Sequence, residues 1–329
     1  MSSDTNKYTV AFASNERGVY PLCVAAWSVV ENAAPETSYD ICILSDGITD
    51  ESKEKLTSLI TKAGPRHSIR FFDAEYIVKL DVGFSEHWPK ATWARIFLAD
   101  VLPDVDKALY LDIDTLVCTD LTPLFSIDMK DAALGVVLEY ESHPGSKFND
   151  RLDIPQSCLG YFNAGVLLMN LAAFRRDGLI SKVMGFAEKY KSVLTCLDQD
   201  ALNGALCDRL IQLHPRWNWH DGLTRRIIKS NPNDRLWHGN SPKTSVEAAL
   251  WPGILHYQGT HKPWFYNHRI EGPRYEASLR RAGLIAPNSP LPGFNAGDWF
   301  KRLLYKPIYA STWKRIKRLA IKLNAQKPE

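Results

Sequence analysis

The first part of the sequence alternates apolar runs with amphipathic segments, and this alternation limits the fold more than any other feature. Three runs rich in branched and aromatic residues predict strands, at residues 8–13, 39–44 and 68–72. The segments between them predict helices, at residues 20–30 and 50–62. Strands joined by helices in this way form right-handed crossovers, so the order predicts a mainly parallel sheet with helices on both faces.

A fourth apolar run, ALYLDIDTLV at residues 108–117, is interrupted by two carboxylates at alternate positions. Because strand side chains alternate between faces, a continuous strand would point Asp112 and Asp114 the same way and Ile113 into the core. Two close carboxylates repel each other, and a hard divalent cation with oxygen ligands removes that repulsion. The alternative is a strand that ends at Asp112, with both acids in a solvated turn.

Other chemically rich positions are expected near the carboxyl ends of the strands, where open α/β sheets bind ligands. The turn at residues 14–18 follows the first strand and lacks the GxGxxG pattern. His256 ends a short apolar run and could complete a metal site, although a structural histidine is the alternative. The loop that follows contains Gly259, which allows close approach of an anion, and Lys262, which suits phosphate.

Several polar side chains lie within otherwise apolar runs and need partners once they are buried. Arg95 could pair with a carboxylate structurally or hold a substrate oxygen. Asn163, near the start of an expected buried strand, must bond to backbone or to a ligand. Asp198 and Asp200 flank Gln199 at an expected helix start, where capping of free N–H groups is the alternative to a catalytic role.

Composition limits the location of the protein. The six cysteines form no CxxC pair and have mostly apolar neighbours, which favours buried thiols over a disulfide framework or a zinc site. The first eight residues lack the apolar core of a signal peptide, and no run of about 18 apolar residues could span a bilayer. We therefore expect a cytoplasmic protein.

The net charge of +3 hides an asymmetry between the body and the C-terminal end. Residues 299–329 carry nine Lys or Arg and one Glu, whereas the rest carries 31 basic and 36 acidic residues. A mildly acidic body argues against nucleic-acid binding. In the basic segment, apolar and aromatic residues recur at near-helical spacing, which favours an anionic membrane surface; a helix docked on the body is the alternative.

These features predict three parts. Residues 1–270 are expected to form one globular domain. Residues 271–298 are rich in Pro and Gly and predict a linker, and residues 299–329 predict a membrane-attaching tail. The tail would place the protein peripherally on the inner face of the cell membrane.

Five blocks between about residues 8 and 264 carry a family resemblance through their order: LCVAA at 22–26, YLDID at 110–114, FNAGVLL at 162–168, DQDALNG at 198–204, and HYQG at 256–259 with KPW at 262–264. With these blocks the sequence resembles glycosyltransferase family 8. Within that family it is most similar to the bacterial lipopolysaccharide and lipooligosaccharide α-galactosyl- and α-glucosyltransferases.

The resemblance implies an α/β GT-A domain, which is a Rossmann-like nucleotide-sugar-binding sheet, followed by a basic aromatic tail. It also implies a retaining hexosyltransferase that uses Mn²⁺, with Mg²⁺ as an alternative. The donor would be a UDP-hexose carrying galactose or glucose. The acceptor would be a glycan, such as the lipopolysaccharide or lipooligosaccharide core.

The same resemblance assigns roles by position. The metal ligands would be Asp112, Asp114 and His256. The nucleotide would be held by Ala13, Asn15, Arg17, Asp112, Ile113, Gly259 and Lys262. The donor sugar would contact Arg95, Asn163, Asp198 and Gln199, and the acceptor would lie toward His87 and Glu139. The catalytic group would consist of Gln199 with Asp198 and Asp200.

One departure concerns the nucleotide. Relatives offer an Asp to the uracil and an Asn to the ribose, and here Asn15 and Arg17 take those places. An amide can still pair with a base edge, but a guanidinium accepts no hydrogen bond. This departure leaves the identity of the base open. The sequence also leaves open the hexose, the acceptor, the linkage position and the oligomeric state.

The expected mechanism is transfer by same-face attack of the acceptor hydroxyl, because an amide at Gln199 is a poor nucleophile. A covalent sugar ester on Asp198 or Asp200 is the competing mechanism. Two other functions use the same features. One is a nucleotide-sugar hydrolase or nucleotidyltransferase with the same metal–diphosphate site, and the other is a non-catalytic nucleotide-sugar-binding module at the membrane.

Overall fold

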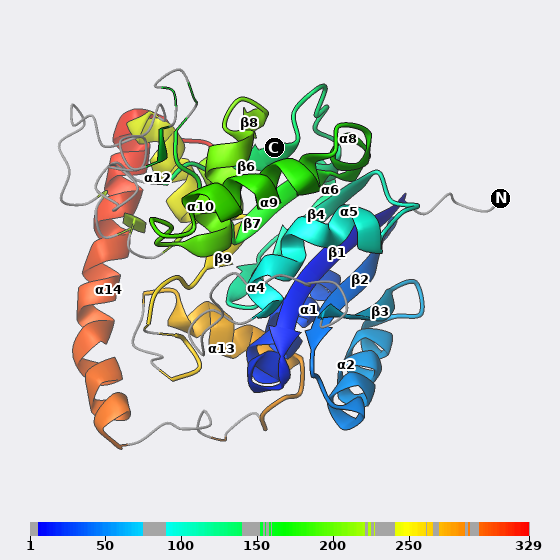
Figure 1. Cartoon of the computed structure of the whole chain (residues 1–329). Helices are drawn as coiled ribbons and strands as arrows, with labels where there is room; N and C mark the ends of the chain where they lie inside the picture. Colours follow the sequence, from blue (N-terminus) through cyan, green and yellow to red (C-terminus); the bar gives the residue numbers. More distant parts are fainter. Residues whose placement is uncertain are drawn as a thin grey trace.

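A computed structural model of the chain describes residues 6–74, 90–139, 152–153, 155, 158, 160–220, 223–224, 227, 241–260, 262–265, 270–286, 289 and 296–328. Figure 1 shows a central twisted sheet with helices packed on it and a long C-terminal helix along one side. His87, expected near the acceptor, lies outside the described residues.

The main sheet of the described residues has seven strands in the order β3-β2-β1-β4-β7-β6-β8. Strands β1, β2, β3 and β4 run parallel, and β7 runs antiparallel to both β4 and β6. Strand β8 is parallel to β6. The strands are β1 (Asn6–Asn15), β2 (Thr37–Asp46), β3 (Ser68–Asp73), β4 (Lys107–Leu111), β6 (Leu134–Val136), β7 (Val166–Asn170) and β8 (Leu210–Gln212). The predicted mainly parallel α/β sheet is confirmed.

Helices cover both faces of this sheet, as expected. Those after the first two strands are α1 (Val19–Glu31) and α2 (Asp50–Ala63). The others in the body are α4 (Lys90–Ala94), α5 (Leu98–Val101), α6 (Thr122–Phe125), α8 (Leu171–Arg176), α9 (Leu179–Tyr190), α10 (Leu197–Leu206) and α12 (Pro242–Leu250). Short 3-10 turns are η1 (Glu16–Gly18), η2 (Arg95–Phe97) and η4 (Pro215–Asn218). Helix α2 begins where the sequence indicates, because the Thr49 side chain accepts from Ser52 N.

The alternation of strand side chains sorts the core into two layers. Ala11, Cys42 and Tyr110 belong to the cluster under α4, α5, α9 and α10. Val10, Ile41 and other residues one position away pack with α1 and α2 on the opposite face. A parallel sheet covered on both faces needs apolar residues at consecutive positions, which explains the continuous apolar runs in the sequence.

The carboxylate pair lies at the end of β4, not inside a continuous strand. Strand β4 ends at Leu111, residues 112–114 form a turn, and β5 (Thr115–Val117) begins a second, two-stranded sheet with β9 (Ile254–His256). The expectation of one strand over residues 108–117 is therefore wrong. Since the turn folds inward, Asp114 is only 8% exposed, and the alternative of a solvated turn does not hold for it.

Two other expectations also need correction. Cys158 and Cys207 form a disulfide, although all six cysteines were expected as thiols, because their loops bring the two Cα atoms within 5.3 Å. The segment expected as a linker contains α13 (Gly272–Arg281), whose Tyr275 and Leu279 are buried. Its Pro lies in the first turn, where a helix tolerates it.

The C-terminal helix α14 (Ala296–Leu323) has two unlike halves. Ile316 and Ala320, in the second half, are buried in a cluster that includes Leu255 and Tyr257. In the first half, Leu304 and Ile308 are each 54% exposed. The second half is thus the docked helix that the sequence left open, and no helix in the described part of the chain is both long and apolar enough to cross a bilayer.

Candidate metal and donor site

The site lies where the strand order reverses, between β1 and β4. The chain leaves β1 toward β2 on one side, and β4 lies on the other, so the carboxyl ends of β1 and β4 border a crevice. The turn after β4 is tied to both neighbouring segments. Asp112 N donates to Gly165 O (2.8 Å), and Tyr257 N donates to Asp114 O (2.9 Å). Pairing of Thr115 with His256 in β5–β9 brings the imidazole over the turn.

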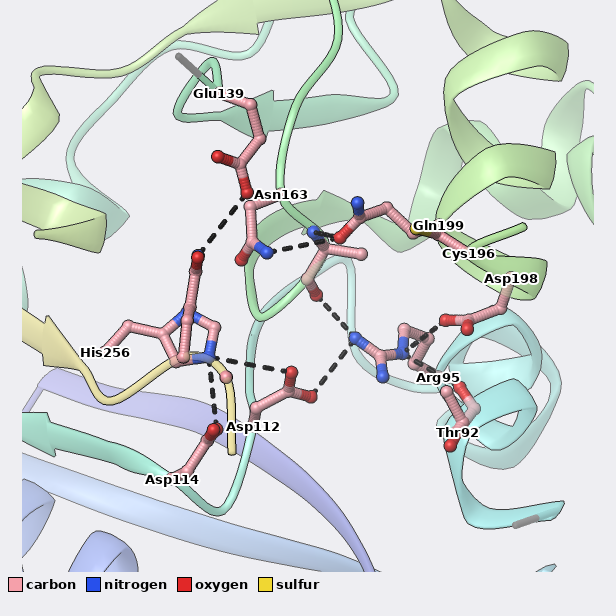
Figure 2. A pocket seen from close by; sticks show the side chains of 13 residues that line it. Thr92, Arg95, Asp112, Asp114, Glu139, Asn163, Cys196, Asp198, Gln199 and His256 are labelled. Carbon is pink, nitrogen blue, oxygen red and sulfur yellow. Dashed lines mark hydrogen bonds and ion pairs between the residues drawn. The ribbon is translucent and has the colours of Figure 1, made fainter. Parts of the chain in front are cut away.

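The side chain of His256 converges with those of Asp112 and Asp114, which are far from it in the sequence (Figure 2). His256 Nε2 lies 3.1 Å from Asp114 Oδ1 and 4.0 Å from Asp112 Oδ2. One ligand atom from each residue lies within 4.8 Å of the others. Two carboxylate oxygens and an imidazole nitrogen form a donor set that suits a divalent cation such as Mn²⁺ or Mg²⁺, so these residues fit the metal implied by the resemblance.

Gly165 lets the backbone approach these ligands closely. A Cβ at this position would lie 2.2 Å from His256 Cε1 and 2.8 Å from Asp112 Oδ2. No side chain fits in that space without moving a ligand. The glycine of the FNAGVLL block therefore serves the site by its lack of a side chain.

The neighbours of Asp114 hold it ionised. Burial by itself raises the pKa of Asp114, but His256 and Lys262 outweigh it and hold the pKa well below its usual value. The Lys262 ammonium forms an ion pair with Asp114 and donates to Tyr257 O (3.0 Å). The positive charge of Lys262 therefore lies against Asp114, one of the three residues of the candidate metal site.

Arg95 links the metal site to the first turn of α10. It is 5% exposed, and its guanidinium lies 3.2 Å from Asp112 Oδ1 and 3.0 Å from Asp198 Oδ2. It also donates to Ala164 O (2.6 Å) and lies over the Tyr110 ring at 4.4 Å. Burial raises the pKa of Asp198 to about 7, against the opposing effect of Arg95. The structural pairing proposed for Arg95 is thus present, beside the site.

Two cavities meet at this point. One of about 290 Å³ is bordered by the three metal-site residues together with Arg95, Glu139, Asn163, Asp198, Gln199 and Gly259. The other, of about 330 Å³, is bordered by Ala13, Asn15, Asp112, Ile113, Lys262 and Trp264. The residues assigned to the donor sugar gather in the first cavity, and most of those assigned to the nucleotide gather in the second.

Some assigned residues have other positions. Asp200 is fully buried and borders neither cavity; its Oδ2 accepts from Thr195 N (2.6 Å) and Cys196 N (2.9 Å). Arg17 is exposed in η1 and borders neither cavity. Asn15 borders the second cavity, but its Oδ1 accepts from Gly18 N (3.2 Å) and caps η1. Glu139 is 7% exposed, with Gln258 Nε2 at 3.5 Å.

Sequence reasoning missed Asn218. It is 3% exposed and its Oδ1 lies 2.9 Å from His256 Nδ1. The available signal was a single amide between Trp217 and Trp219, because a buried amide among aromatics must be hydrogen-bonded. Tyr110 was also missed; its hydroxyl donates to Asp112 Oδ1 (3.0 Å).

Known proteins resemble the chain over most of its length. The chain is 27% identical to general stress protein A of Bacillus subtilis over 244 residues, and this aligned region covers 73% of this chain and 81% of that protein. It is 25% identical over 268 residues to the lipopolysaccharide 1,3-galactosyltransferase of Salmonella typhimurium, covering 80% and 74%. Identity to the lipopolysaccharide 1,2-glucosyltransferase of Escherichia coli is 27% over 256 residues, covering 78% and 72%.

Solved structures agree with these relatives. The galactosyltransferase LgtC, in complex with donor and acceptor sugar analogues, superposes with a TM-score of 0.70 at 28% identity, covering 86% of this chain and 97% of that one. The model of the family described as glycosyl transferase family 8 matches residues 9–268, which span the sheet, the carboxylate turn and His256. The chain therefore belongs to glycosyltransferase family 8 and is a glycosyltransferase with a GT-A-like fold.

Proposed function

We propose that this enzyme transfers an α-linked hexose, galactose or glucose, from a UDP-sugar to a glycan acceptor of the lipopolysaccharide or lipooligosaccharide core. The observation that carries the proposal is the convergence of Asp112, Asp114 and His256 beside two adjoining cavities. The activities of the Salmonella and Escherichia relatives support the acceptor class and the two candidate hexoses.

The donor would bind across the two cavities. The nucleotide would lie in the second cavity, along Ala13, Asn15 and Ile113. The sugar would lie in the first cavity, near Asp198 and Gln199. The diphosphate then falls between them, beside the carboxylate turn and Lys262. Asp112, Asp114 and His256 would hold Mn²⁺ or Mg²⁺, which would neutralise the negative charge of the leaving diphosphate. Lys262 adds a second positive charge at the same place.

The transfer keeps the anomeric configuration through same-face attack. The bond from C1 to the diphosphate oxygen breaks, a bond from C1 to the acceptor oxygen forms, and the acceptor proton passes to the leaving phosphate. Gln199 is poorly placed as a nucleophile, because its Oε1 already accepts from Ala164 N (2.9 Å) and Asn163 Nδ2 (3.2 Å). Asp198 is buried against Arg95, which supports a role in orienting the donor sugar.

Turnover assays test this proposal directly. UDP-galactose and UDP-glucose are each incubated with Mn²⁺ and a lipooligosaccharide core acceptor, and the product is analysed for linkage and anomeric configuration. We expect a retained α-linkage with one donor and a rise in melting temperature when that donor and Mn²⁺ are added. Release of free sugar alone, whatever the acceptor, would identify a hydrolase instead, and full turnover by Asp114→Ala would contradict the metal site.

We also propose that α14 attaches the enzyme to an anionic membrane, on the inner face of the cell membrane. Leu304, Tyr305 and Ile308 are exposed on neighbouring turns of its first half. Exposed Lys301 and Lys306 lie among them, and each Lys near an anionic surface contributes about 1 kcal/mol. The second half is docked, which limits the apolar contact to the first half. The boundaries at residues 270 and 298 stay a prediction.

A further inference from the structure

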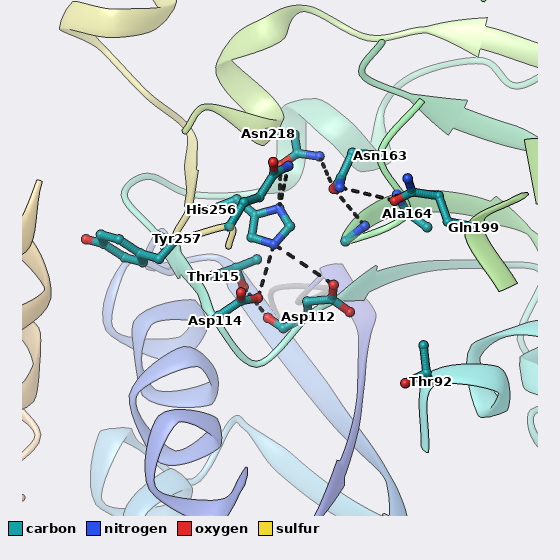
Figure 3. A network of polar contacts seen from close by, with 12 residues as sticks. Thr92, Asp112, Asp114, Thr115, Asn163, Ala164, Gln199, Asn218, His256 and Tyr257 are labelled. Carbon is teal, nitrogen blue, oxygen red and sulfur yellow. Dashed lines mark hydrogen bonds and ion pairs between the residues drawn. The ribbon is translucent and has the colours of Figure 1, made fainter. Parts of the chain in front are cut away.

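A chain of hydrogen bonds connects the metal ligand His256 to amides on the far side of the site (Figure 3). His256 Nδ1 lies 2.9 Å from Asn218 Oδ1. Asn218 Nδ2 donates to Asn163 Oδ1 (3.0 Å), and Asn163 Nδ2 donates to Gln199 Oε1 (3.2 Å). Each amide thus receives a hydrogen bond at its oxygen and passes one on from its nitrogen.

Two backbone N–H groups set the direction of this chain. Gly165 N donates to Asn163 Oδ1 (2.9 Å), and Ala164 N donates to Gln199 Oε1 (2.9 Å). A backbone N–H can only donate, so both side-chain atoms must be the amide oxygens. The atom of Asn163 that faces Asn218 is therefore an oxygen, so Asn218 must donate to it from its amide nitrogen. The amide oxygen of Asn218 is then the atom that faces His256.

The tautomer of His256 follows from this orientation. Facing an amide oxygen at 2.9 Å, Nδ1 must carry the proton, which leaves Nε2 directed at Asp112 and Asp114. Gln258 Nε2 lies 3.5 Å from the same Nδ1, at the outer limit for a hydrogen bond, so the shorter Asn218 contact decides.

The other end of the chain is a buried carboxylate. Gln199 Nε2 donates to the Tyr161 hydroxyl (2.8 Å), and that hydroxyl donates to Asp200 Oδ1 (2.9 Å). An amide nitrogen can only donate and a carboxylate can only accept, so the Tyr161 hydroxyl accepts from Gln199 and gives its single proton to Asp200. Burial raises the pKa of Tyr161, which keeps that proton in place.

We infer that Asn218 and Tyr161 are positioning residues of one directed hydrogen-bond chain, from His256 through Asn218, Asn163, Gln199 and Tyr161 to Asp200. Asn218 fixes the tautomer of His256 and so presents Nε2 to the metal. Tyr161 fixes the Gln199 amide, so that its oxygen faces the backbone of Ala164. Hydrogen bonds that all run one way polarise each other, and the chain ends on a carboxylate that accepts the last proton.

The first test measures binding of Mn²⁺ alone to the full chain, from the electron paramagnetic resonance signal of the free ion. Asn218→Ala removes the acceptor for His256 Nδ1, and we expect the dissociation constant to rise about 10- to 100-fold. Asn218→Asp keeps an acceptor of the same size, and we expect affinity within about threefold of wild type, or tighter. Asn218→Leu fills about the same space without an acceptor, and we expect it to bind Mn²⁺ as weakly as Asn218→Ala. Rescue by Asn218→Asp but not by Asn218→Leu separates a hydrogen-bond acceptor from a group that only fills space.

Asn170→Ala is the matched control for loss of an amide. Asn170 also bridges two segments, since its Nδ2 donates to Ala132 O (3.2 Å) and its Oδ1 accepts from Ala173 N (3.0 Å). It borders neither cavity of the site. We expect its Mn²⁺ affinity to equal that of wild type. Asn218→Ala with unchanged affinity, or Asn218→Asp as weak as Asn218→Ala, would overturn the role of Asn218.

The second test separates the two ends of the chain. Tyr161→Phe should leave the Mn²⁺ dissociation constant within twofold but lower kcat about tenfold, because Gln199 loses the partner of its nitrogen. Tyr39→Phe is the matched control, since the Tyr39 hydroxyl also donates to a carboxylate, Asp120 (2.9 Å), and accepts from Leu121 N (2.9 Å), away from the site. Its kcat should be that of wild type.

The kcat comparison rests on the proposed function, whereas the Mn²⁺ measurement does not require turnover. A wild-type protein that binds no Mn²⁺ would contradict the proposed metal site. A wild-type protein that binds Mn²⁺ and turns over, with Tyr161→Phe and Tyr39→Phe equal in kcat, would overturn the role of Tyr161 while the proposed function stands.

Discussion

At the scale of single residues, Gly165 offers a direct test of how closely the metal ligands are packed. A methyl group there would lie 2.2 Å from His256 Cε1, so the imidazole or the backbone must shift. We expect Gly165→Ala to weaken Mn²⁺ binding and turnover at least tenfold. Overpacking should also lower the free energy of unfolding by about 1–3 kcal/mol.

Gly185→Ala serves as the matched control. This glycine lies inside α9, and an added Cβ would meet no atom within 4 Å apart from the neighbouring backbone of its own helix. Alanine favours a helix over glycine by up to about 1 kcal/mol, so the control should keep full activity and gain stability in urea unfolding. Normal Mn²⁺ binding by Gly165→Ala would show that the ligands have more space than their distances indicate.

His67 gives stability a pH dependence away from the site. It is 7% exposed and accepts from Tyr39 N at Nδ1 (3.2 Å), and burial together with the Arg66 charge lowers the pKa of His67 to about 4. As pH falls below 6.5, the unfolded chain takes up a proton that the folded chain refuses until near pH 4. The free energy of unfolding should therefore fall by about 2 kcal/mol from this group across that range.

Urea unfolding of wild type and His67→Gln at several pH values between 7.5 and 4 measures this contribution. The variant has no titrating ring, so its stability should fall less steeply with acid than that of wild type. Parallel curves for the two proteins would mean that His67 is protonated as easily in the folded chain as in the unfolded one.

The residue types of the site were readable from the sequence, but their partners were not. Asp112, Asp114 and His256 have side chains that bind cations, and their ligand atoms all lie within 4.8 Å of one another, as expected for a metal site. Asn218 has no such signature. Its role depends on the register of β5 with β9 and on the turn η4, which are long-range contacts that a local pattern does not contain.

At the scale of elements, periodicity predicted the strands and helices of residues 6–73 well, because each is continuous and lies between clear turns. It failed where the chain changes sheets. The run at residues 108–117 has the composition of one strand, yet the β4 ladder ends at Leu111 and a new ladder begins at Thr115. Composition alone cannot place that break, since both parts are buried and apolar.

The docked half of α14 can be tested with one residue type in two environments. Ile316 is fully buried and Ile321 is 82% exposed, five positions later in the same helix. We expect Ile316→Ala to lower the free energy of unfolding by about 2–4 kcal/mol, and Ile321→Ala to change it by less than about 0.5 kcal/mol. Urea unfolding measures both, and equal losses would contradict docking of this half.

At the scale of the whole molecule, the C-terminal helix and the metal site share one core. The cluster that buries Ile316 and Ala320 also contains Leu255 and Tyr257, the residues on either side of His256. Deleting residues 299–329 would therefore expose apolar surface beside a metal ligand. A test of membrane attachment should leave the docked half in place and change only the exposed half.

Leu304→Asp combined with Ile308→Asp meets this requirement. The two changes remove exposed apolar side chains and add two negative charges, which should reduce sedimentation with phosphatidylglycerol vesicles at least tenfold, because both apolar burial and attraction to anionic lipid are lost. Turnover of a soluble acceptor should stay within twofold of wild type. Ile321→Asp controls for added charge, since Ile321 is exposed on another side of α14, and it should sediment like wild type. If the double variant still sediments fully, the first half of α14 is not the membrane contact, and the enzyme must reach its acceptor by another surface.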